Sequence, residues 1–334
     1  MTIINAAKTI YSLLNSVKKQ HRFITAELGE ILADAKQSND GSLDASDFKK
    51  ITHYYGLAVP AILGDSICAL RGFKMTKKER LALTYQGAMT GLFDDFFDKF
   101  NMSDEQVKAF MEKPDELKGE NSAEKLFLVF YKNALLNAHD PVLVSKYLRQ
   151  VYQAQIESKK QVAPGLSENE ILDITLKKGG VSVLFYRASM SHSFVEGEEE
   201  ALNEMGGLMQ FGNDIFDIYK DSNSNIQTIP TTAKNIDSVR QLFTNQMNKS
   251  FALTEQLSYK AKHKKKYLSL VTMSLCSRCF VCLDQLKMNE KATNLVFMPE
   301  KYTREQLVCD MDKRRNKIKT ISYFFTTEHI NGTK

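Results

Sequence analysis

Residues that turn or break a chain are scarce in this sequence. Its 334 residues include 6 prolines and 16 glycines, and no proline falls within residues 165–229 or 231–298. Sandwiches and propellers need a turn every few residues and use more of both residue types. Because a chain with so few turn formers has to run in long segments, the sequence predicts an all-α fold built from long helices.

Apolar residues that recur at spacings of three and four place these helices along the chain. We expect helices over 4–36, 44–57, 60–72, 77–100, 104–112, 121–138, 141–158, 168–193, 197–221, 235–259, 263–288 and 303–325. Several starts carry a capping box, in which a hydroxyl accepts from the amide three residues on and a Glu or Gln side chain reaches back. The capping pairs are Thr76 with Glu79, Ser103 with Gln106, Ser167 with Glu170, and Thr303 with Gln306. No composition shift marks a linker, so we expect one all-α domain over residues 1–334.

Composition and charge exclude several classes of function. Hydrophobic residues make up 43% and charged residues 25%, as in ordinary globular proteins, and the net charge of +5 predicts no nucleic-acid partner. No stretch approaches the length of uncharged apolar sequence that a bilayer requires, so we expect no transmembrane segment. The first residues lack a secretory signal, and the odd count of 5 cysteines argues against a disulfide framework, which together predict a cytoplasmic protein. Cys276, Cys279 and Cys282 are interpreted as core residues.

A first group of carboxylates ends the helix expected over 77–100. Asp94 and Asp98 are four residues apart, so they share one helix face, and Asp95 stands beside them. Two carboxylates there repel each other, and the negative end of the helix dipole adds to the cost. Because aspartate oxygens suit Mg²⁺, the three aspartates are candidate metal ligands.

A second group stands near the end of the helix expected over 197–221. Asn213, Asp217 and Asp221 follow one another at intervals of four, and each step drifts by only about 40° around a helix. All three should therefore project to one side and form a second row of oxygen ligands. Two such rows on two helices could face each other across a bundle, which is how helical bundles build metal sites. Lys220 lies beside the last ligand and is a candidate to hold an anion.

The two groups together resemble a known family. Asp94-Asp95-Phe96-Phe97-Asp98 is similar to the aspartate-rich DDxxD motif of class I isoprenoid synthases. The second group resembles the NDxxSxxxE motif of terpene synthases: Asn213 and Lys220 match it, while Asp217 and Asp221 replace its Ser and Glu with other oxygen ligands.

The resemblance implies a class I terpenoid synthase-like helical bundle around a central apolar cavity. It further implies roughly three Mg²⁺ ions that bridge the two motifs to a prenyl diphosphate substrate. The metal ligands implied are Asp94, Asp95, Asp98, Asn213, Asp217 and Asp221. The activity implied is that of a terpene synthase, a lyase that ionises an allylic diphosphate and releases inorganic diphosphate, with cyclisation or quenching of the carbocation.

Three cationic residues are candidates to bind the diphosphate. Arg187 is the only arginine between Lys159 and the second motif, Lys220 adjoins the last ligand, and Arg314 belongs to a basic run over 313–319. Arginine and lysine clamp phosphate oxygens, which is the reason for naming them.

Other functions stay open at this point. Chain-elongating prenyl diphosphate synthases carry a second DDxxD motif, of which residues 213–217 fit as a variant, and Gln210 with Lys177 or Lys178 fits that branch too. Those enzymes carry paired arginines soon after the first motif, and residues 99–105 contain none, so a terpene synthase is favoured. A head-to-head condensing enzyme of the squalene or phytoene type and a non-catalytic helical scaffold are the further alternatives, and a homodimer is left open.

Residues 36–47 resemble a calcium-binding loop, with Asp40-Gly41 in the matching place. The first ligand position would fall on Lys36, which a calcium site cannot use, so the sequence predicts a plain loop there.

Overall fold

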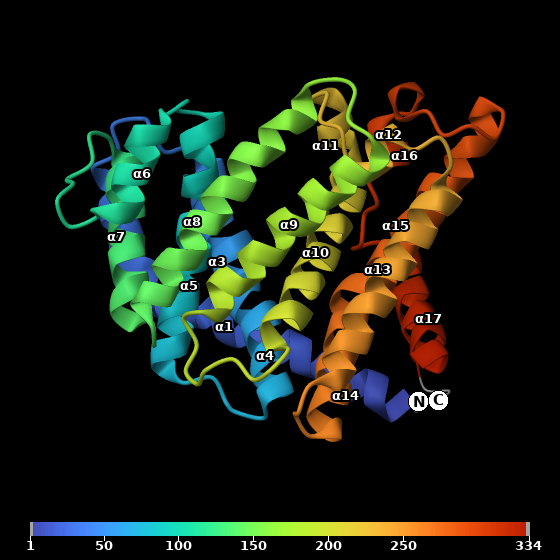
Figure 1. Ribbon diagram of the computed structural model, residues 1–334, viewed down its shortest axis with the longest axis horizontal. Coiled ribbons are helices and arrows are strands. Elements are labelled where there is room, and N and C mark those ends of the chain that lie inside the picture. The colour runs from blue at the N-terminus through green and yellow to red at the C-terminus, as the bar shows by residue number, and fades with distance from the viewer. Residues whose placement is uncertain (1–2, 332–334) are drawn as a thin grey trace. The chain divides into compact units, whose positions relative to one another are not determined.

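The computed structural model of the chain describes residues 3–331, with side chains for residues 3–327 (Figure 1). These described residues are 78% helical and contain no strand, which confirms the expected all-α class. The helices are α1 (Ile3–Gln37), α2 (Ala45–Lys49), α3 (Tyr55–Ala58), α4 (Asp65–Arg71), α5 (Lys77–Asp98), α6 (Asp104–Glu112), α7 (Ser122–Asn137), α8 (Pro141–Ser158), α9 (Glu168–Arg187), α10 (Glu198–Phe216), α11 (Ile218–Asn223), α12 (Ile229–Thr232), α13 (Ile236–Gln256), α14 (Ala261–Val271), α15 (Ser277–Asn289), α16 (Arg304–Leu307) and α17 (Arg314–Asn331).

Contacts within the chain divide it into two compact units. The N-terminal unit comprises residues 11–149 and 185–193, and the C-terminal unit comprises residues 150–184 and 194–334 together with the start of α1. Each unit has its own core. The expectation of a single domain over residues 1–334 stays a prediction.

Aromatic side chains form much of the core of each unit. In the N-terminal unit α5 packs along α7 (Figure 1). The ring centroid of Phe127 lies 4.8 Å from that of Phe96 and 5.9 Å from that of Phe93. In the C-terminal unit α10 packs on α13, and α15 packs on α17. Phe243 of α13 lies between Phe211 of α10 and Phe280 of α15, at 5.6 Å from each in edge-to-face geometry. Such pairs add to the stabilisation that burial alone provides.

The capping boxes expected from the sequence are confirmed. The hydroxyl of Thr76 accepts from the amide of Glu79, and the Glu79 carboxylate accepts from the amide of Thr76 at 2.8 Å. Ser103 with Gln106, Ser167 with Glu170, and Thr303 with Gln306 make the same reciprocal pairs. The sequence therefore located these helix starts to within a residue.

The helices expected over 44–57 and 60–72 form one longer helical run. Two π-helical segments, Lys50–Tyr54 and Val59–Gly64, join α2, α3 and α4 without a break. Pro60, which in a regular α-helix would clash with the carbonyl four residues earlier, lies at the start of the second segment. The wider turn accommodates Pro60, so the helical run continues through this residue. The sequence predicted a break there, between residues 57 and 60, and that prediction is wrong.

The helix expected over 168–193 ends early, at Arg187. The Glu79 carboxylate accepts from both the amide and the hydroxyl of Ser191, at 2.9 and 2.5 Å. The Arg187 guanidinium donates to the carbonyls of His192 and Ser193. These tertiary hydrogen bonds satisfy the backbone of residues 191–193 in a non-helical form, and His192 takes a left-handed φ of 69°.

The helix expected over 303–325 is broken between α16 and α17. The side-chain amide of Gln285 on α15 donates to the carbonyls of Gln306 and Val308, and that of Asn289 donates to Gln306. These side-chain bonds stabilise the backbone that follows α16, where Val308 is extended with φ −87° and ψ 112°.

One helical stretch of the described residues, Ala261–Thr293, is long and apolar enough to cross a membrane by length and composition alone. Of its apolar window, 72% is buried inside the protein, as in the core helix of a soluble protein. The expectation of no transmembrane segment stays a prediction.

Candidate functional site

The first acidic motif lies at the end of α5 in the N-terminal unit. Asp95 is buried, Asp94 is half-buried and Asp98 is exposed. The neighbouring Phe93, Phe96 and Phe97 are all buried and pack on one another, so these aromatic side chains belong to the core. The three carboxylates therefore have three different environments, although they stand within five residues.

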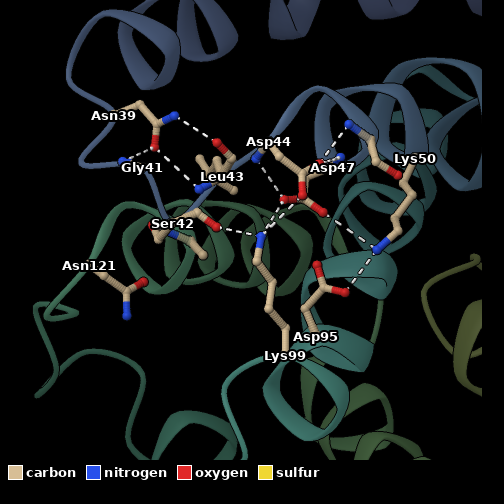
Figure 2. A network of polar contacts seen from close by, with 12 residues as sticks. Asn39, Gly41, Ser42, Leu43, Asp44, Asp47, Lys50, Asp95, Lys99 and Asn121 are labelled. Carbon is tan, nitrogen blue, oxygen red and sulfur yellow. Dashed lines mark hydrogen bonds and ion pairs between the residues drawn. The ribbon is translucent and has the colours of Figure 1, made fainter.

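Asp95 belongs to a network of charged groups that the sequence analysis did not find (Figure 2). Its Oδ1 lies 2.8 Å from the ammonium of Lys50, which also lies 3.5 Å from Asp47. Burial raises the pKa of Asp95, and the Lys50 ammonium opposes that rise. Burial also acts to raise the pKa of Asp47, but hydrogen bonds from the Asp44 amide and from Lys99 outweigh it, and the pKa is lowered. Because Lys50 already neutralises Asp95, this residue is the least suited of the three aspartates to bind a metal.

Glycines on α5 make room for the network. A Cβ atom on Gly91 would lie 2.9 Å from Cδ of Lys50, so the lysine stem passes directly over this residue. One turn earlier, a Cβ on Gly87 would lie 2.5 Å from the carbonyl oxygen of Tyr55. The absence of side chains at Gly87 and Gly91 lets the helical run over residues 45–71 approach α5 closely enough for Lys50 to reach Asp95.

Asp94 lies near a buried hydroxyl. Tyr186 OH and Thr90 Oγ1 are 2.8 Å apart. Burial raises the pKa of Tyr186; its hydrogen bond to Thr90 opposes the rise, and the negative charge of Asp94 adds to it. Asp94 therefore acts electrostatically on a buried, neutral phenol that is hydrogen-bonded to Thr90.

The second acidic motif lies in the C-terminal unit, and it is not one uninterrupted helix as expected. α10 ends at Phe216, Asp217 takes a non-helical conformation with φ −90° and ψ 6°, and α11 begins at Ile218. Asn213 is exposed, whereas Asp221 is buried. The side-chain amide of Asn213 donates to Asp217 Oδ2 at 3.3 Å, so the first two members of the expected row remain in contact.

A fourth oxygen-bearing residue, Asp214, completes this group. Its two carboxylate oxygens accept from Thr175 at 2.8 Å and from Gln210 at 2.9 Å. Burial raises the pKa of Asp214 to about 6 against these hydrogen bonds. Asp214 was not selected from the sequence, although it stands next to Asn213, because the interval of four excluded it.

The carboxylates of this second group act on one another electrostatically. The pKa of Asp221 is raised to about 7, first by burial and then by the negative charges of Asp214 and Asp217. Lys220 and Lys178 oppose that rise. A site in which burial and like charge keep a carboxyl partly protonated at neutral pH is one that a cation would stabilise.

Two further glycines bring α9 and α10 together at this site. A Cβ on Gly206 would lie 2.3 Å from the carbonyl oxygen of Gly179, and a Cβ on Gly179 would lie 2.1 Å from that of Gly206. Only glycine permits two backbones to approach so closely. This crossing brings Thr175 on α9 within hydrogen-bond distance of Asp214 on α10.

The three cations expected to bind diphosphate have different environments. Arg187 is 1% exposed and engaged by the carbonyls of residues 192 and 193. Lys220 is exposed beside Asp221, and Arg314 is exposed as the first residue of α17. Lys178, which the sequence suggests only as a residue of a chain-elongating enzyme, acts electrostatically on both Asp214 and Asp221. A role in diphosphate binding stays a prediction for Arg187, Lys220 and Arg314.

The structure describes each acidic motif within its own unit, so the expectation that the two rows face each other stays a prediction. Among the described residues, no group of three or more His, Cys, Asp and Glu side chains is arranged to hold a metal ion. All five cysteines are buried as free thiols, which agrees with the core interpretation of Cys276, Cys279 and Cys282.

Comparisons of the chain with protein-family models, with curated proteins and with solved structures returned no match.

Proposed function

We propose that the protein is a Mg²⁺-dependent terpene synthase, which ionises an allylic prenyl diphosphate and releases inorganic diphosphate. The observation that carries the proposal is the group of Asp214, Asp217 and Asp221, in which burial first, and then the charges of Asp214 and Asp217, raise the pKa of Asp221 to about 7. The resemblance of residues 94–98 and 213–221 to the acidic motifs of isoprenoid synthases supports the same activity.

The donor groups are suited to magnesium. Carboxylate and amide oxygens are hard ligands, and Mg²⁺ prefers them to nitrogen or sulfur. The residues proposed to hold the ions are Asp94 and Asp98 in the N-terminal unit, and Asn213, Asp217 and Asp221 in the C-terminal unit. When bound, the ions would act as Lewis acids that neutralise the negative charge on a departing diphosphate.

Residues around the ligands position them. Thr175 and Gln210 hold both oxygens of Asp214, so this buried carboxylate keeps a fixed orientation next to the proposed ligands. Near Asp94, Tyr186 and Thr90 hydrogen-bond to each other at 2.8 Å. Lys220 and Lys178 supply positive charge at the second motif, where an anionic diphosphate would need it.

A chain-elongating prenyl diphosphate synthase is the second candidate, because one observation favours it. Lys178 acts on Asp214 and Asp221, as the lysine upstream of the second motif in that branch would. Lys177, the other residue considered for this role, instead pairs with Glu157 at 2.5 Å. Against this candidate, the first cation after the first motif is Lys99, and its ammonium is engaged by Asp44 and Asp47.

A substrate assay separates these functions. The purified chain is incubated with Mg²⁺ and radiolabelled C10 to C25 allylic diphosphates, with and without isopentenyl diphosphate. A terpene synthase converts one allylic diphosphate into a hydrocarbon or alcohol and inorganic diphosphate, and Arg314→Ala weakens this reaction at most moderately. A product that appears only with isopentenyl diphosphate would establish the elongating enzyme instead, and no turnover of any substrate would refute both.

A further inference from the structure

The loop between α1 and α2 has the layout of a calcium-binding loop. In such loops, which have about twelve residues, oxygens at positions one, three, five, seven, nine and twelve bind the ion, and a glycine stands at position six. Counting from Lys36, Gly41 falls at position six and has the positive φ of 95° that the sharp turn requires. α1 ends at Gln37 and α2 begins at Ala45, so a helix enters and a helix leaves the loop.

The later ligand positions of this loop carry oxygens. Position seven is the carbonyl of Ser42, position nine is Asp44, and position twelve is Asp47. Asp44 caps α2, and the Asp47 carboxylate accepts from the Asp44 amide at 2.9 Å, so both are held in place by the helix start. The Asp40 carboxylate accepts from the Ser42 amide within the loop and from the amide of Ser122 at the start of α7, and the second bond fixes the loop from outside.

A cation from outside the loop contacts an oxygen at each of positions seven, nine and twelve (Figure 2). The ammonium of Lys99, the residue directly after α5, lies 2.8 Å from the Ser42 carbonyl, 3.3 Å from Asp44 Oδ2 and 3.2 Å from Asp47 Oδ2. These are the donors of positions seven, nine and twelve. The carboxylate of Asp47 is buried, so its interaction with the ammonium is less screened by water than a surface ion pair.

Position one of the loop, Lys36, carries a positive charge where a calcium-binding loop has a ligand oxygen. The ammonium of Lys36 lies 5.1 Å from the ring centroid of Phe48 on α2, in a cation–π contact. Of the ammonium groups near the loop oxygens, that of Lys99 contacts all three positions, whereas that of Lys50 reaches only Asp47 Oδ1, at 3.5 Å.

We propose that residues 36–47 form a cation-binding loop in which the ammonium of Lys99 takes the place of a divalent ion. The lysine is a built-in cation, so the loop needs no metal to hold its shape. Because Lys99 directly follows Asp98, the same contacts fasten the loop to the end of α5, on which the first acidic motif lies. The proposal does not depend on the terpene synthase activity.

Removal of the ammonium tests this directly. Lys99→Met keeps most of the stem and removes the charge, and isothermal titration calorimetry measures Ca²⁺ binding. We expect Lys99→Met to bind one Ca²⁺ per chain more than the wild type, with a Kd on the order of 10⁻⁴ to 10⁻³ M. Adding Lys36→Asp should tighten this site about tenfold or more, because it supplies the missing first ligand. Lys99→Met should also gain a rise in melting temperature with Ca²⁺ that the wild type lacks.

Matched variants make the result specific. Lys113→Met removes an exposed ammonium elsewhere in the N-terminal unit and should gain no Ca²⁺ site. Asp44→Asn in the Lys99→Met background keeps the helix cap and a ligand oxygen but removes one charge, so it should weaken the new site several-fold, whereas Asp221→Asn should leave it unchanged. If Lys99→Met does not fold, Lys99→Gln replaces it. An unchanged Ca²⁺ stoichiometry in the folded variant, or a new site whose affinity Asp44→Asn leaves unchanged, would overturn the proposal.

Discussion

The ammonium of Lys50 lies 2.8 Å from Oδ1 of Asp95, although the two residues are 45 positions apart in the sequence. Lys50 begins a π-helical segment, and its stem passes over Gly91 to reach the carboxylate. π-helical segments are rare and are often found at functional sites. This pair fixes the middle aspartate of the first acidic motif and leaves Asp94 and Asp98 as its candidate ligands.

Loss of Lys50 should destabilise the fold. Lys50→Met leaves Asp95 and Asp47 without their shared partner, and breaking a buried ion pair is costly because it leaves an unpaired buried charge. Since the Lys50 side chain is 31% exposed, we expect a loss of about 1–3 kcal/mol in the free energy of unfolding, measured with urea. The double variant Lys50→Met/Asp95→Asn should recover part of it, and full stability of Lys50→Met would refute the role of the pair.

The crossing of α9 and α10 should not tolerate a side chain. Gly206→Ala would put a Cβ 2.3 Å from the Gly179 carbonyl oxygen, so the backbones would have to move apart, at a cost of about 1–3 kcal/mol or more. Gly29→Ala in α1 is the matched control, because a Cβ there meets nothing within 4 Å. That substitution should stabilise the protein by about 0.5–1 kcal/mol through helix propensity. Equal effects of the two substitutions on the melting temperature would contradict the crossing.

Stability of the metal-free protein should fall as pH rises toward 7. The pKa values of Asp214 and Asp221 are raised to about 6 and about 7 in the folded state, from an ordinary value of 3.8. The native state therefore holds protons that the unfolded chain has already released. The stabilisation is fully present below about pH 4 and is lost as pH rises through the folded pKa values, with a total on the order of a few kcal/mol.

The pH dependence is measured by chemical denaturation between pH 4 and 8 without divalent ions. Asp221→Asn removes one of the two groups and should flatten the fall relative to the wild type. Parallel curves for the wild type and Asp221→Asn would show that Asp221 has an ordinary pKa.

The first acidic motif is expected to be essential for turnover and dispensable for folding. Asp94→Ala and Asp98→Ala should each reduce the release of inorganic diphosphate by orders of magnitude, because each removes a proposed Mg²⁺ ligand. Their circular dichroism and melting temperature should match or slightly exceed those of the wild type, since a repelling carboxylate is removed. Asp104→Ala, at an exposed position on α6, serves as the control and should keep full activity. Wild-type turnover in both motif variants would reject the metal ligands.

The second motif is tested through ligand-induced stabilisation. A ligand that binds only the native state raises the melting temperature, so Mg²⁺ with inorganic diphosphate should stabilise the wild type. Asn213→Ala should abolish this shift without lowering the melting temperature of the free protein, because Asn213 is exposed. Persistence of the full shift in Asn213→Ala would mean that Asn213 does not hold the ion.

Local sequence patterns fixed much of the secondary structure. The scarcity of proline and glycine, the apolar spacing and the capping boxes at Thr76, Ser103, Ser167 and Thr303 predicted an all-α chain and located these helix starts. These signals depend on residues within about one helical turn of one another, which is why they can be read without the fold. The two acidic groups were visible for the same reason.

Long-range contacts decided the rest. The side chains of Glu79 and Gln285 bind the segments that follow α9 and α16, and nothing local in the sequence indicates that either helix ends there. Lys50 and Lys99 reach the acidic groups at Asp95 and Asp47 only because glycine contacts and the turn at Gly41 bring distant segments together. Sequence alone therefore determined which residues could carry the chemistry. Only the tertiary structure decided which carboxylates pair with a lysine and which, like Asp221, have a pKa raised by burial and like charge, because burial and partner distance set the energy of a charge.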